Sequence, residues 1–334
     1  MTTSSHFAVS YGRNIAHGLG AAIGPAIVVA HPEPWEHLRH TWGNEPVALV
    51  SPGNLSMAHL DALARELPTA GAVIGIGGGS AMDTAKWIHW RRGIELYQVP
   101  SLPSVDACFT RMSALRDGSD VRYEGDAVPE MVYVDFELMR AAPIEMVRAG
   151  IGDVLSCHTA RFDWELATSR GHGPGWDDSA ADAATASIVE LEAIAELVRD
   201  ATDEGLQRLM EQHRDVGWRC HDLGHARFEE GSEHFFAYCF EHVTGRTILH
   251  GEIVTVGVLI MSALQGNSPE RVRAIVDAVG TRHSPDTLDL TWDEIDETLR
   301  RLPQFVRDGG YWYSVANELT VEDSVFSAAR DALH

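Results

Sequence analysis

Two sets of residues in this chain have types and spacings that could do chemistry. The first is the run from Gly75 to Lys86, which contains the consecutive glycines Gly77, Gly78 and Gly79. A short apolar segment precedes this run, and a stretch without proline or glycine follows it, which predicts a strand, a tight turn and a helix. Glycines in such a turn let a ligand approach the backbone, and the amides that begin the helix favour an anion such as a diphosphate. A turn packed only for steric reasons is the alternative.

The start of this helix carries two polar residues with predicted roles. Ser80 is expected to be the N-cap, and Asp83 follows it at the third helical position, as in a capping box. The run differs from a GxGxxG dinucleotide fingerprint, and no GK[ST] follows it as in a phosphate-binding Walker loop. The turn therefore predicts an anion site without identifying the ligand.

The second set consists of Asp153, His234 and His250, each within three residues of a glycine near the start of an apolar helical segment. A carboxylate and two neutral imidazoles suit a divalent zinc or iron ion and leave positions open for water or substrate. Such an ion polarises an alcohol or carbonyl oxygen. The three residues lie far apart in the sequence and follow no local rule. From spacing alone, an N-capping aspartate and two core histidines are therefore favoured.

Two more residues are candidates beside these sets. Asp106 follows a Ser/Pro-rich loop at the end of a predicted strand, and it could accept a hydrogen bond from a substrate hydroxyl or cap a turn. Cys157 comes four residues after Asp153, on the same predicted helix face. It could be a fourth ligand, but a buried structural thiol is the favoured interpretation.

The composition excludes several classes of partner. The chain has 334 residues, 45% of them hydrophobic, which is enough for two domains with separate cores. Its net charge of −23 argues against nucleic acid and anionic membranes as partners. The four cysteines form no CxxC pair and indicate reduced thiols in a cytoplasmic protein. We expect no signal peptide and no membrane span, because no apolar stretch approaches about 18 residues.

The order of predicted elements indicates the fold class. Strands and helices alternate up to Phe136, which predicts a doubly wound, mostly parallel α/β sheet in residues 1–136. Beyond it strand signals vanish, so residues 137–334 are expected to form an all-α domain. Within the first domain, the polar stretch from Arg116 to Gly125 is expected to be a hairpin tip. The helices predicted in the second domain are Glu145 to Ala149, Asp153 to Thr168, Ala180 to Arg199, Glu204 to His213, Gly231 to Phe240, Glu252 to Gln265, Pro269 to Val279, Trp292 to Leu302 and Val321 to Leu333.

Taken in order, these segments resemble a known family. The motifs are Gly77 to Lys86, Val99 to Ala107, Ala149 to Ser156 with Asp163 to Ala167 after it, Gly231 to His234, and Leu249 to Glu252. Together they are similar to the superfamily of iron-containing alcohol dehydrogenases, glycerol dehydrogenases and dehydroquinate synthases. The sn-glycerol-1-phosphate dehydrogenase branch is the most similar, and the resemblance runs from about Tyr11 to about Leu319. It implies a dehydroquinate synthase-like fold.

The resemblance also implies roles for named residues. Asp153, His234 and His250 would hold the metal ion, usually Zn²⁺ in this branch, with Fe²⁺ or Ni²⁺ as alternatives. An NAD or NADP cofactor would lie in the first domain, and hydride transfer would occur in a cleft between the domains. Asp106 would contact substrate hydroxyls, and the catalytic set would be Asp106 with the three ligands. The residues implied in cofactor binding are His31, Gly77, Gly78, Gly79, Ser80, Asp83, Ser101 and Ser104.

The chain departs from the family pattern at several positions. Where many relatives have an aspartate for the adenosine ribose, this chain has His31, and an imidazole repels a 2′-phosphate less, so NADP use is plausible. Val105 stands where the branch often has a histidine. Cys157 replaces a histidine of four-ligand iron enzymes, which favours a three-ligand site. No phosphate-binding cluster is identified, so the sequence supports the dehydrogenase chemistry better than a phosphorylated substrate.

The leading hypothesis is a metal-dependent NAD(P)(H) oxidoreductase that interconverts a secondary alcohol and a ketone of a small polyol or polyol phosphate. The alternative is a dehydroquinate or inosose synthase-like cyclase with tightly bound NAD. A third hypothesis is a binding or scaffolding protein on a decayed dehydrogenase fold. A homo-oligomer is expected from the resemblance alone.

Overall fold

The computed structural model describes residues 6–103, 106–117 and 120–334. Ser104, one of the expected cofactor-binding residues, lies outside the described residues. The chain divides into two compact units, which are described separately below. The first unit is Met1–Val147 with Ala201–Gly224, and the second is Arg148–Asp200 with His225–His334.

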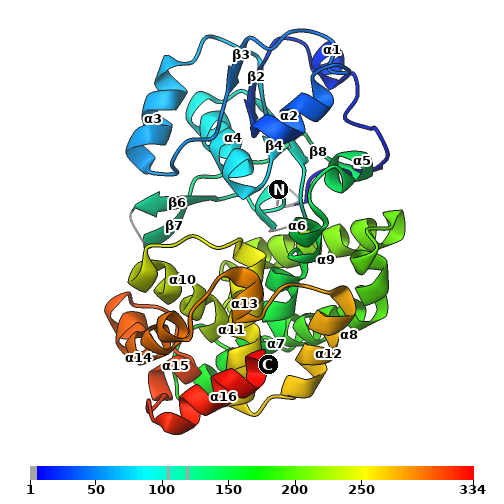
Figure 1. The fold of residues 1–334 in the computed structure, drawn as a ribbon. Coiled ribbons are helices and arrows are strands. Elements are labelled where there is room, and N and C mark those ends of the chain that lie inside the picture. The colour runs from blue at the N-terminus through cyan, green and yellow to red at the C-terminus, as the bar shows by residue number, and fades with distance from the viewer. Residues whose placement is uncertain (1–5, 104–105, 118–119) are drawn as a thin grey trace. The chain divides into compact units, whose positions relative to one another are not determined.

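A six-stranded sheet forms the centre of the first unit, in the order β1-β8-β5-β4-β2-β3 (Figure 1). Every neighbouring pair in this sheet is parallel. The doubly wound parallel sheet expected from the alternation of strands and helices is therefore confirmed. The strands are β1 (Val9–Gly12), β2 (Ala26–Ala30), β3 (Ala48–Val50), β4 (Ala72–Gly77), β5 (Glu95–Pro100) and β8 (Met131–Asp135).

The central strands β2 and β4 are apolar and buried along their whole length because helices cover both faces of the sheet. In β2, Ile27 and Val29 belong to one hydrophobic cluster, whereas Ala26, Val28 and Ala30 belong to a second cluster. This alternation is the period of two that a strand imposes on its side chains. The helices of this unit are α1 (Leu19–Ile23), α2 (Pro32–Leu38), α3 (Met57–Glu66), α4 (Gly79–Arg92), α5 (Phe136–Arg140) and α9 (Asp203–Leu223), with the 3₁₀ turn η1 (Asp106–Cys108).

The helix α9 joins the first unit although it comes late in the chain. Its residues Leu206 and Met210 belong to the same cluster as Ile27 and Val29 of the sheet. The compact units therefore differ from a single division near residue 136, since the first extends to Val147 and takes in a later helix. The assignment of cofactor to residues 1–136 and of metal and substrate to residues 137–334 stays a prediction.

A two-stranded antiparallel hairpin comes between β5 and β8 in the chain. Its strands are β6 (Ser113–Asp117) and β7 (Asp120–Glu124). The polar stretch from Arg116 to Gly125 was expected to be only a hairpin tip, and that expectation is wrong, because β7 lies inside it. Arg122 and Glu124 alternate with Val121 and Tyr123, so this strand has the period-2 pattern but little of the apolar character that would have made it recognisable.

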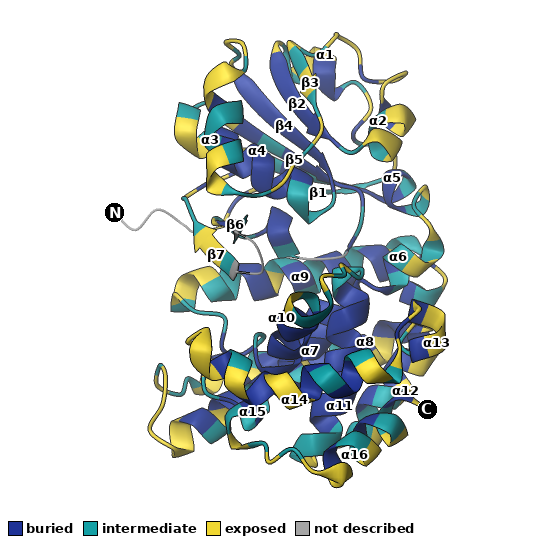
Figure 2. Cartoon of the chain, turned by 60° about the vertical axis from the view of Figure 1, so that its left-hand side comes forward, coloured by how far each residue is buried: buried dark blue, intermediate teal, exposed yellow. Residues whose placement is uncertain are grey.

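The second unit is helical, as expected for the C-terminal part. Figure 2 shows that α7, α10 and α11 are largely buried, whereas α14 and α16 each carry an exposed face. Of the described residues, no helix is long and apolar enough to cross a membrane. The helices are α7 (Ile151–Ser169), α8 (Asp178–Arg199), α10 (Ser232–Thr244), α11 (His250–Gln265), α12 (Pro269–Val279), α13 (Pro285–Leu288), α14 (Trp292–Asp308), α15 (Val315–Glu318) and α16 (Asp323–Leu333), and α6 (Ile144–Arg148) connects the units in sequence.

Candidate metal and dinucleotide sites

The glycine turn of the first unit joins the end of β4 to α4. Gly77 has φ +144°, a conformation that favours glycine. A Cβ at Gly77 would also lie 2.2 Å from Nδ1 of His31, so the neighbouring ring leaves no room for a side chain. The turn itself is partly exposed at Gly78, Gly79 and Ser80. The first amides of α4 have no partner within the helix and are positioned to donate to an anion.

His31 follows β2 and contacts the glycine turn. Its Nδ1 accepts a hydrogen bond from the Gly78 amide at 3.3 Å, and its Nε2 lies 3.0 Å from the Ser80 hydroxyl. Burial lowers the pKa of His31, against the opposing effect of the Glu33 carboxylate. The imidazole is therefore neutral near pH 7 and can accept the Gly78 hydrogen bond.

Ser80 does not begin the helix as expected. The N-cap of α4 is Gly78, and no side chain caps this helix end. The helix starts earlier because the glycines themselves adopt its first turn, so Ser80 is the second helical residue. Its hydroxyl contacts His31 instead of a backbone amide of its own helix.

Ser101 lies beside the turn, whereas Asp83 lies in the interior of the unit. The Ser101 amide donates to the Gly77 carbonyl at 2.9 Å, so the loop after β5 is tied to the glycine turn. The Asp83 carboxylate pairs with the Lys86 ammonium at 2.8 Å, and both side chains are buried. Burial raises the pKa of Asp83, and the Lys86 charge opposes that rise. This pair fixes α4 against the loop at Thr110, which accepts a hydrogen bond from Lys86 at 3.0 Å.

Asp106 lies in η1, against α9 of the same unit. A Cβ placed on Gly217 of α9 would be 3.1 Å from Asp106 Oδ2, so the glycine makes room for this carboxylate. Asp106 is half-buried, which leaves part of its surface open to a ligand.

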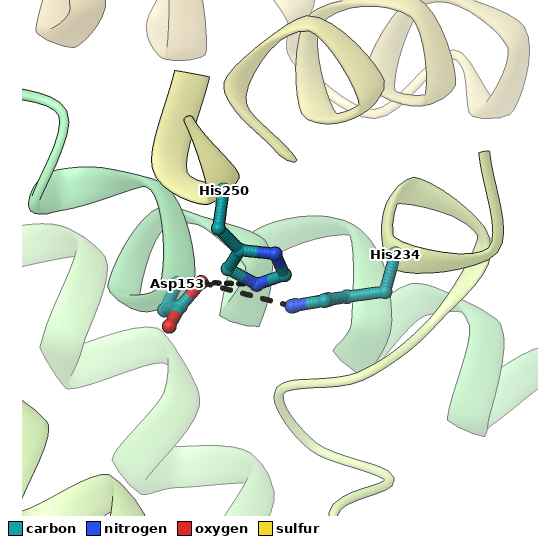
Figure 3. A group of neighbouring side chains, drawn as sticks. All are labelled: Asp153, His234 and His250. Atoms are coloured by element: carbon teal, nitrogen blue, oxygen red, sulfur yellow. Dashed lines mark ion pairs between the residues drawn. The ribbon is translucent and has the colours of Figure 1, made fainter. Parts of the chain in front are cut away.

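In the second unit, Asp153, His234 and His250 converge from three different helices, α7, α10 and α11 (Figure 3). One ligand atom from each lies within 4.8 Å of the others. Asp153 Oδ1 is 3.2 Å from His250 Nε2 and 3.7 Å from His234 Nε2. Asp153 is the third residue of α7, whose N-cap is Gly150, so the alternative in which it caps the helix is wrong.

The geometry of this cluster favours a positive charge between His234 and Asp153, which either a proton on His234 Nε2 or a metal ion can supply. Glu233 Oε1 lies 2.9 Å from His234 Nδ1, and a carboxylate can only accept, so Nδ1 carries the ring proton. In the neutral ring, the lone pair of Nε2 then faces Asp153 Oδ1, which is buried and has no hydrogen-bond partner. Facing lone pairs repel each other unless a positive charge lies between them. The donor set of two imidazoles and one carboxylate fits a divalent metal ion.

The pKa shifts agree with a site that draws positive charge. Burial raises the pKa of Asp153, but the two imidazoles outweigh burial and hold it well below its usual range. Burial lowers the pKa of His234, but Asp153 and Glu233 outweigh burial and raise it well above its usual range. Cys157 is fully buried, and burial together with nearby carboxylates raises the pKa of its thiol. Among the described residues, the group whose ligand atoms converge consists of Asp153, His234 and His250 without Cys157, which agrees with a three-residue set.

Glycines bring the three ligand helices together. A Cβ on Gly251 would lie 2.0 Å from the Ala149 carbonyl oxygen, and one on Gly152 would lie 2.3 Å from the Gly251 carbonyl oxygen. On α11, a Cβ on Gly257 would lie 2.5 Å from the Glu233 carbonyl oxygen. These positions therefore place Asp153, His250 and the start of α10 at backbone contact distance.

Two buried carboxylates hold the start of α10. Glu233 Oε1 accepts the Gly231 amide at 2.6 Å, and Glu233 Oε2 accepts the Thr159 hydroxyl at 2.7 Å. Asp163 accepts the Ser232 amide at 2.8 Å. The sequence alone predicts no role for Glu233, although an acidic residue directly before a candidate ligand, at the start of an apolar helix, is a usable signal.

Three further histidines, His158, His221 and His225, are engaged in other contacts and are not part of the Asp153, His234 and His250 cluster. His158 Nε2 is 2.6 Å from the Asn267 carbonyl oxygen, and His225 packs edge-on against Trp164. His221 lies beside Arg111, whose guanidinium is bidentate with Asp126. These contacts agree with treating the three histidines as non-ligands.

The comparisons with known proteins agree with this architecture. Residues 39–143 match the profile described as iron-containing alcohol dehydrogenase. Glycerol-1-phosphate dehydrogenase from Aeropyrum pernix is 31% identical over 227 residues, which cover 68% of this chain and 64% of that protein. The protein of the same name from Picrophilus torridus is 31% identical over 211 residues, 63% of this chain and 60% of that protein. The matched segments thus span less than two thirds of these relatives.

A solved structure extends the likeness to nearly the whole chain. Glycerol dehydrogenase from Schizosaccharomyces pombe superposes with a TM-score of 0.71, covering 98% of this chain and 90% of that one at 19% identity. At that identity the likeness establishes the fold. In its profile match, its sequence relatives and its fold, the chain is therefore similar to the iron-containing alcohol dehydrogenase family.

Proposed function

We propose that this protein is a metal-dependent NAD(P)(H) oxidoreductase that interconverts a secondary alcohol and a ketone of a small polyol or polyol phosphate. The observation that carries the proposal is the convergence of Asp153, His234 and His250 around a buried carboxylate oxygen that has no hydrogen-bond partner. The name of the Aeropyrum relative, glycerol-1-phosphate dehydrogenase with NAD(P)+, supports the substrate class and the cofactor.

Asp153, His234 and His250 would hold one divalent ion, and Zn²⁺ is the ion we propose. Fe²⁺ and Ni²⁺ are the alternatives that the same nitrogen and oxygen donors accept. When bound, such an ion acts as a Lewis acid toward an alcohol or carbonyl oxygen. The chain's own contribution is to fix the three donor atoms, with Asp153 and His234 buried and His250 half-buried.

The dinucleotide would bind at the glycine turn of the first unit. Gly77, Gly78 and Gly79 let the diphosphate reach the backbone, and the first amides of α4 donate to it. Ser80 and Ser101 flank the turn, the latter through its bond to Gly77. Ser104 stays a proposal from the resemblance. Asp83 would act indirectly, because its carboxylate is engaged by Lys86.

His31 is proposed to lie at the adenosine ribose, where its neutral ring admits either NAD or NADP. Asp106 is proposed to accept a hydrogen bond from a substrate hydroxyl. The four cysteines are free thiols, which favours a reducing, cytoplasmic location. A homo-oligomer remains part of the proposal on the family resemblance alone.

Elemental analysis of the purified protein, combined with NADH and NADPH oxidation over a panel of ketones that includes dihydroxyacetone phosphate, tests the proposal. We expect about one divalent ion per chain and net consumption of reduced cofactor with at least one ketone. A tightly bound NAD that shows no net turnover would favour the cyclase. Binding of neither metal nor cofactor would favour the non-enzymatic scaffold and overturn the proposal.

A further inference from the structure

A carboxylate outside the ligand set controls one of the ligands. We propose that Glu233 is a positioning residue that fixes the ring orientation and the tautomer of His234, so that His234 Nε2 is held as a metal donor. The proposal rests on the proposed metal site and adds to it a residue whose side chain contacts no ligand atom of that site. Glu233 is fully buried, with no exposed surface.

Each oxygen of the Glu233 carboxylate has a distinct set of partners. Oε1 accepts both the Gly231 amide at 2.6 Å and the His234 Nδ1–H at 2.9 Å. Oε2 accepts the Thr159 hydroxyl at 2.7 Å. Thr159 is in α7, the helix that carries Asp153, so a single carboxylate links the His234 ring to the helix of another ligand. The ring cannot rotate without breaking the bond to Oε1.

The charge of Glu233 also acts on the donor strength of the ring. An ionised carboxylate at Nδ1–H raises the electron density at Nε2 and so strengthens its bond to a metal ion. The Arg227 guanidinium is buried as well and interacts electrostatically with Glu233, Asp163 and Glu230. A positive charge thus lies in the same buried region as these three acidic residues.

Asp163 provides a matched comparison in the same place. It is equally buried and also accepts a backbone amide at the start of α10, that of Ser232 at 2.8 Å. Its other oxygen accepts the Val315 amide at 2.8 Å. In contrast to Glu233, Asp163 accepts hydrogen bonds from backbone amides and supports the start of α10. A variant at Asp163 therefore shows the effect of losing helix support alone, without losing the contact to the His234 ring.

The test compares Glu233→Gln with Asp163→Asn in the full-length protein. Gln loses the charge but keeps an acceptor at the Oε1 position for Gly231 and His234. Its NH₂ group replaces Oε2, and the Thr159 hydroxyl can rotate to accept a hydrogen bond from it. Asn at position 163 must turn an NH₂ group toward a backbone amide. Three readouts are needed: Zn²⁺ affinity by competition with a chromophoric chelator, the visible spectrum of the Co²⁺-loaded protein, and thermal melting.

We expect Glu233→Gln to weaken Zn²⁺ binding by about 10- to 100-fold and to alter the Co²⁺ spectrum, with little change in melting temperature. Asp163→Asn is expected to lower the melting temperature more and to change metal affinity by less than about threefold. If the Gln variant misfolds, Thr159→Val removes only the donor to Oε2 and is expected to weaken Zn²⁺ binding by a few fold.

Two results overturn the positioning role. One is wild-type Zn²⁺ affinity in Glu233→Gln and Thr159→Val, and the other is an equal loss of affinity in Asp163→Asn at matched stability. In Zn²⁺-loaded protein, the ¹⁵N spectrum of the His234 imidazole gives a further readout, with the proton expected on Nδ1. A wild-type protein that binds neither Zn²⁺ nor Co²⁺ overturns the proposed function itself, which is a distinguishable outcome.

Discussion

The two candidate sites are built from different parts of the polypeptide. At the glycine turn of the first unit, the groups offered to a ligand are mainly backbone amides on a partly exposed loop. In the second unit, three side chains from α7, α10 and α11 are offered, and Asp153 and His234 are buried. A backbone site is encoded within a few consecutive residues, whereas a side-chain site depends on how distant helices pack.

Glycine has a different purpose in each site. Gly78 in the turn has open space around it, with Leu102 Cδ1 as the nearest atom to a Cβ at 3.9 Å. Gly251 has none, because a Cβ would meet the Ala149 carbonyl oxygen at 2.0 Å. The first glycine therefore serves a ligand, and the second serves the fold that positions the ligands.

The largest expected effect follows removal of a metal ligand. Asp153→Ala, His234→Ala and His250→Ala should each lose metal and turnover together. The loss should exceed the roughly 100-fold that marks the upper range for an outer hydrogen-bond partner, because a donor atom itself is removed. Elemental analysis and steady-state rates on the same preparations provide the measurement. Full metal occupancy with normal turnover in all three variants would rule out this cluster.

Gly251→Ala tests the fold-serving glycine. Because its Cβ collides with backbone, we expect a loss of about 3 kcal/mol or more in the free energy of unfolding, together with weaker metal binding. Gly175→Ala is the matched control in the same unit, because a Cβ there meets no atom within 4 Å. Chemical denaturation of both variants measures the difference. Equal stability of the two would contradict the close helix contact.

Gly78→Ala tests the ligand-serving glycine. Its backbone, at φ −88° and ψ −169°, is accessible to alanine, so we expect stability to fall by less than about 0.5 kcal/mol. A methyl group on the path of a diphosphate should raise the dissociation constant of NADH or NADPH by about tenfold or more. Cofactor fluorescence titration beside a melting curve separates these outcomes. Unchanged cofactor affinity would contradict the proposed binding of the dinucleotide at this turn.

His31 allows a finer test of which dinucleotide is preferred. His31→Asp and His31→Asn differ by one charge and can both accept the Gly78 amide. We expect the Asp variant to bind NADPH several-fold more weakly, relative to NADH, than the Asn variant does, because only the carboxylate repels a 2′-phosphate. The ratio of the two dissociation constants, measured at one ionic strength, is the readout. Identical ratios would place the 2′ position elsewhere.

The smallest expected effect is a pH dependence of opposite sign in the two regions. Burial, followed by the neighbouring Glu233 charge, raises the pKa of Asp163 to about 6. Its unfolded value is about 3.9, so its contribution to stability is complete below that value and is lost as pH rises through 6. Burial lowers the pKa of His31 below its usual value of about 6.5. Its contribution is therefore present above that value and is lost as pH falls.

Amide hydrogen exchange corrected for intrinsic rates can resolve the two regions. When the pH is lowered from about 7.5 to about 5.5, the protection of backbone amides from exchange should rise at the start of α10 and fall at the glycine turn. Asp163→Asn should remove the first trend and His31→Gln the second. Trends of the same sign in both regions would contradict the assignment of either pKa direction.

Much of the fold could be predicted because its signals are local. The apolar strands Ala26–Ala30 and Ala72–Gly77 and the glycine turn between β4 and α4 are readable within short windows. The strand β7 was missed because it is polar, and the place of α9 in the first unit was missed because that depends on Leu206 and Met210 packing against distant strands. Ser80 was misplaced by two positions because the glycines extend the helix backwards.

The site was predictable only in part. Spacing alone favoured a capping aspartate and core histidines, and the family resemblance reversed that preference. The proximity of Asp153, His234 and His250 depends on helix contacts that no periodicity encodes. The role of Glu233 could not be predicted from the sequence because it depends on the contact of its carboxylate with His234 Nδ1, which only the three-dimensional structure shows.

The contacts at Gly152, Gly251 and Gly257 have a mechanical consequence for the metal centre. Where helices touch through main-chain atoms, their separation is set by rigid peptide planes instead of by side chains that change rotamer. Repacking the apolar residues elsewhere along α7, α10 and α11 would then alter stability while leaving the separation of the three donors nearly constant. The backbone contacts therefore set the relative positions of the three donors and make them insensitive to substitutions in the surrounding core.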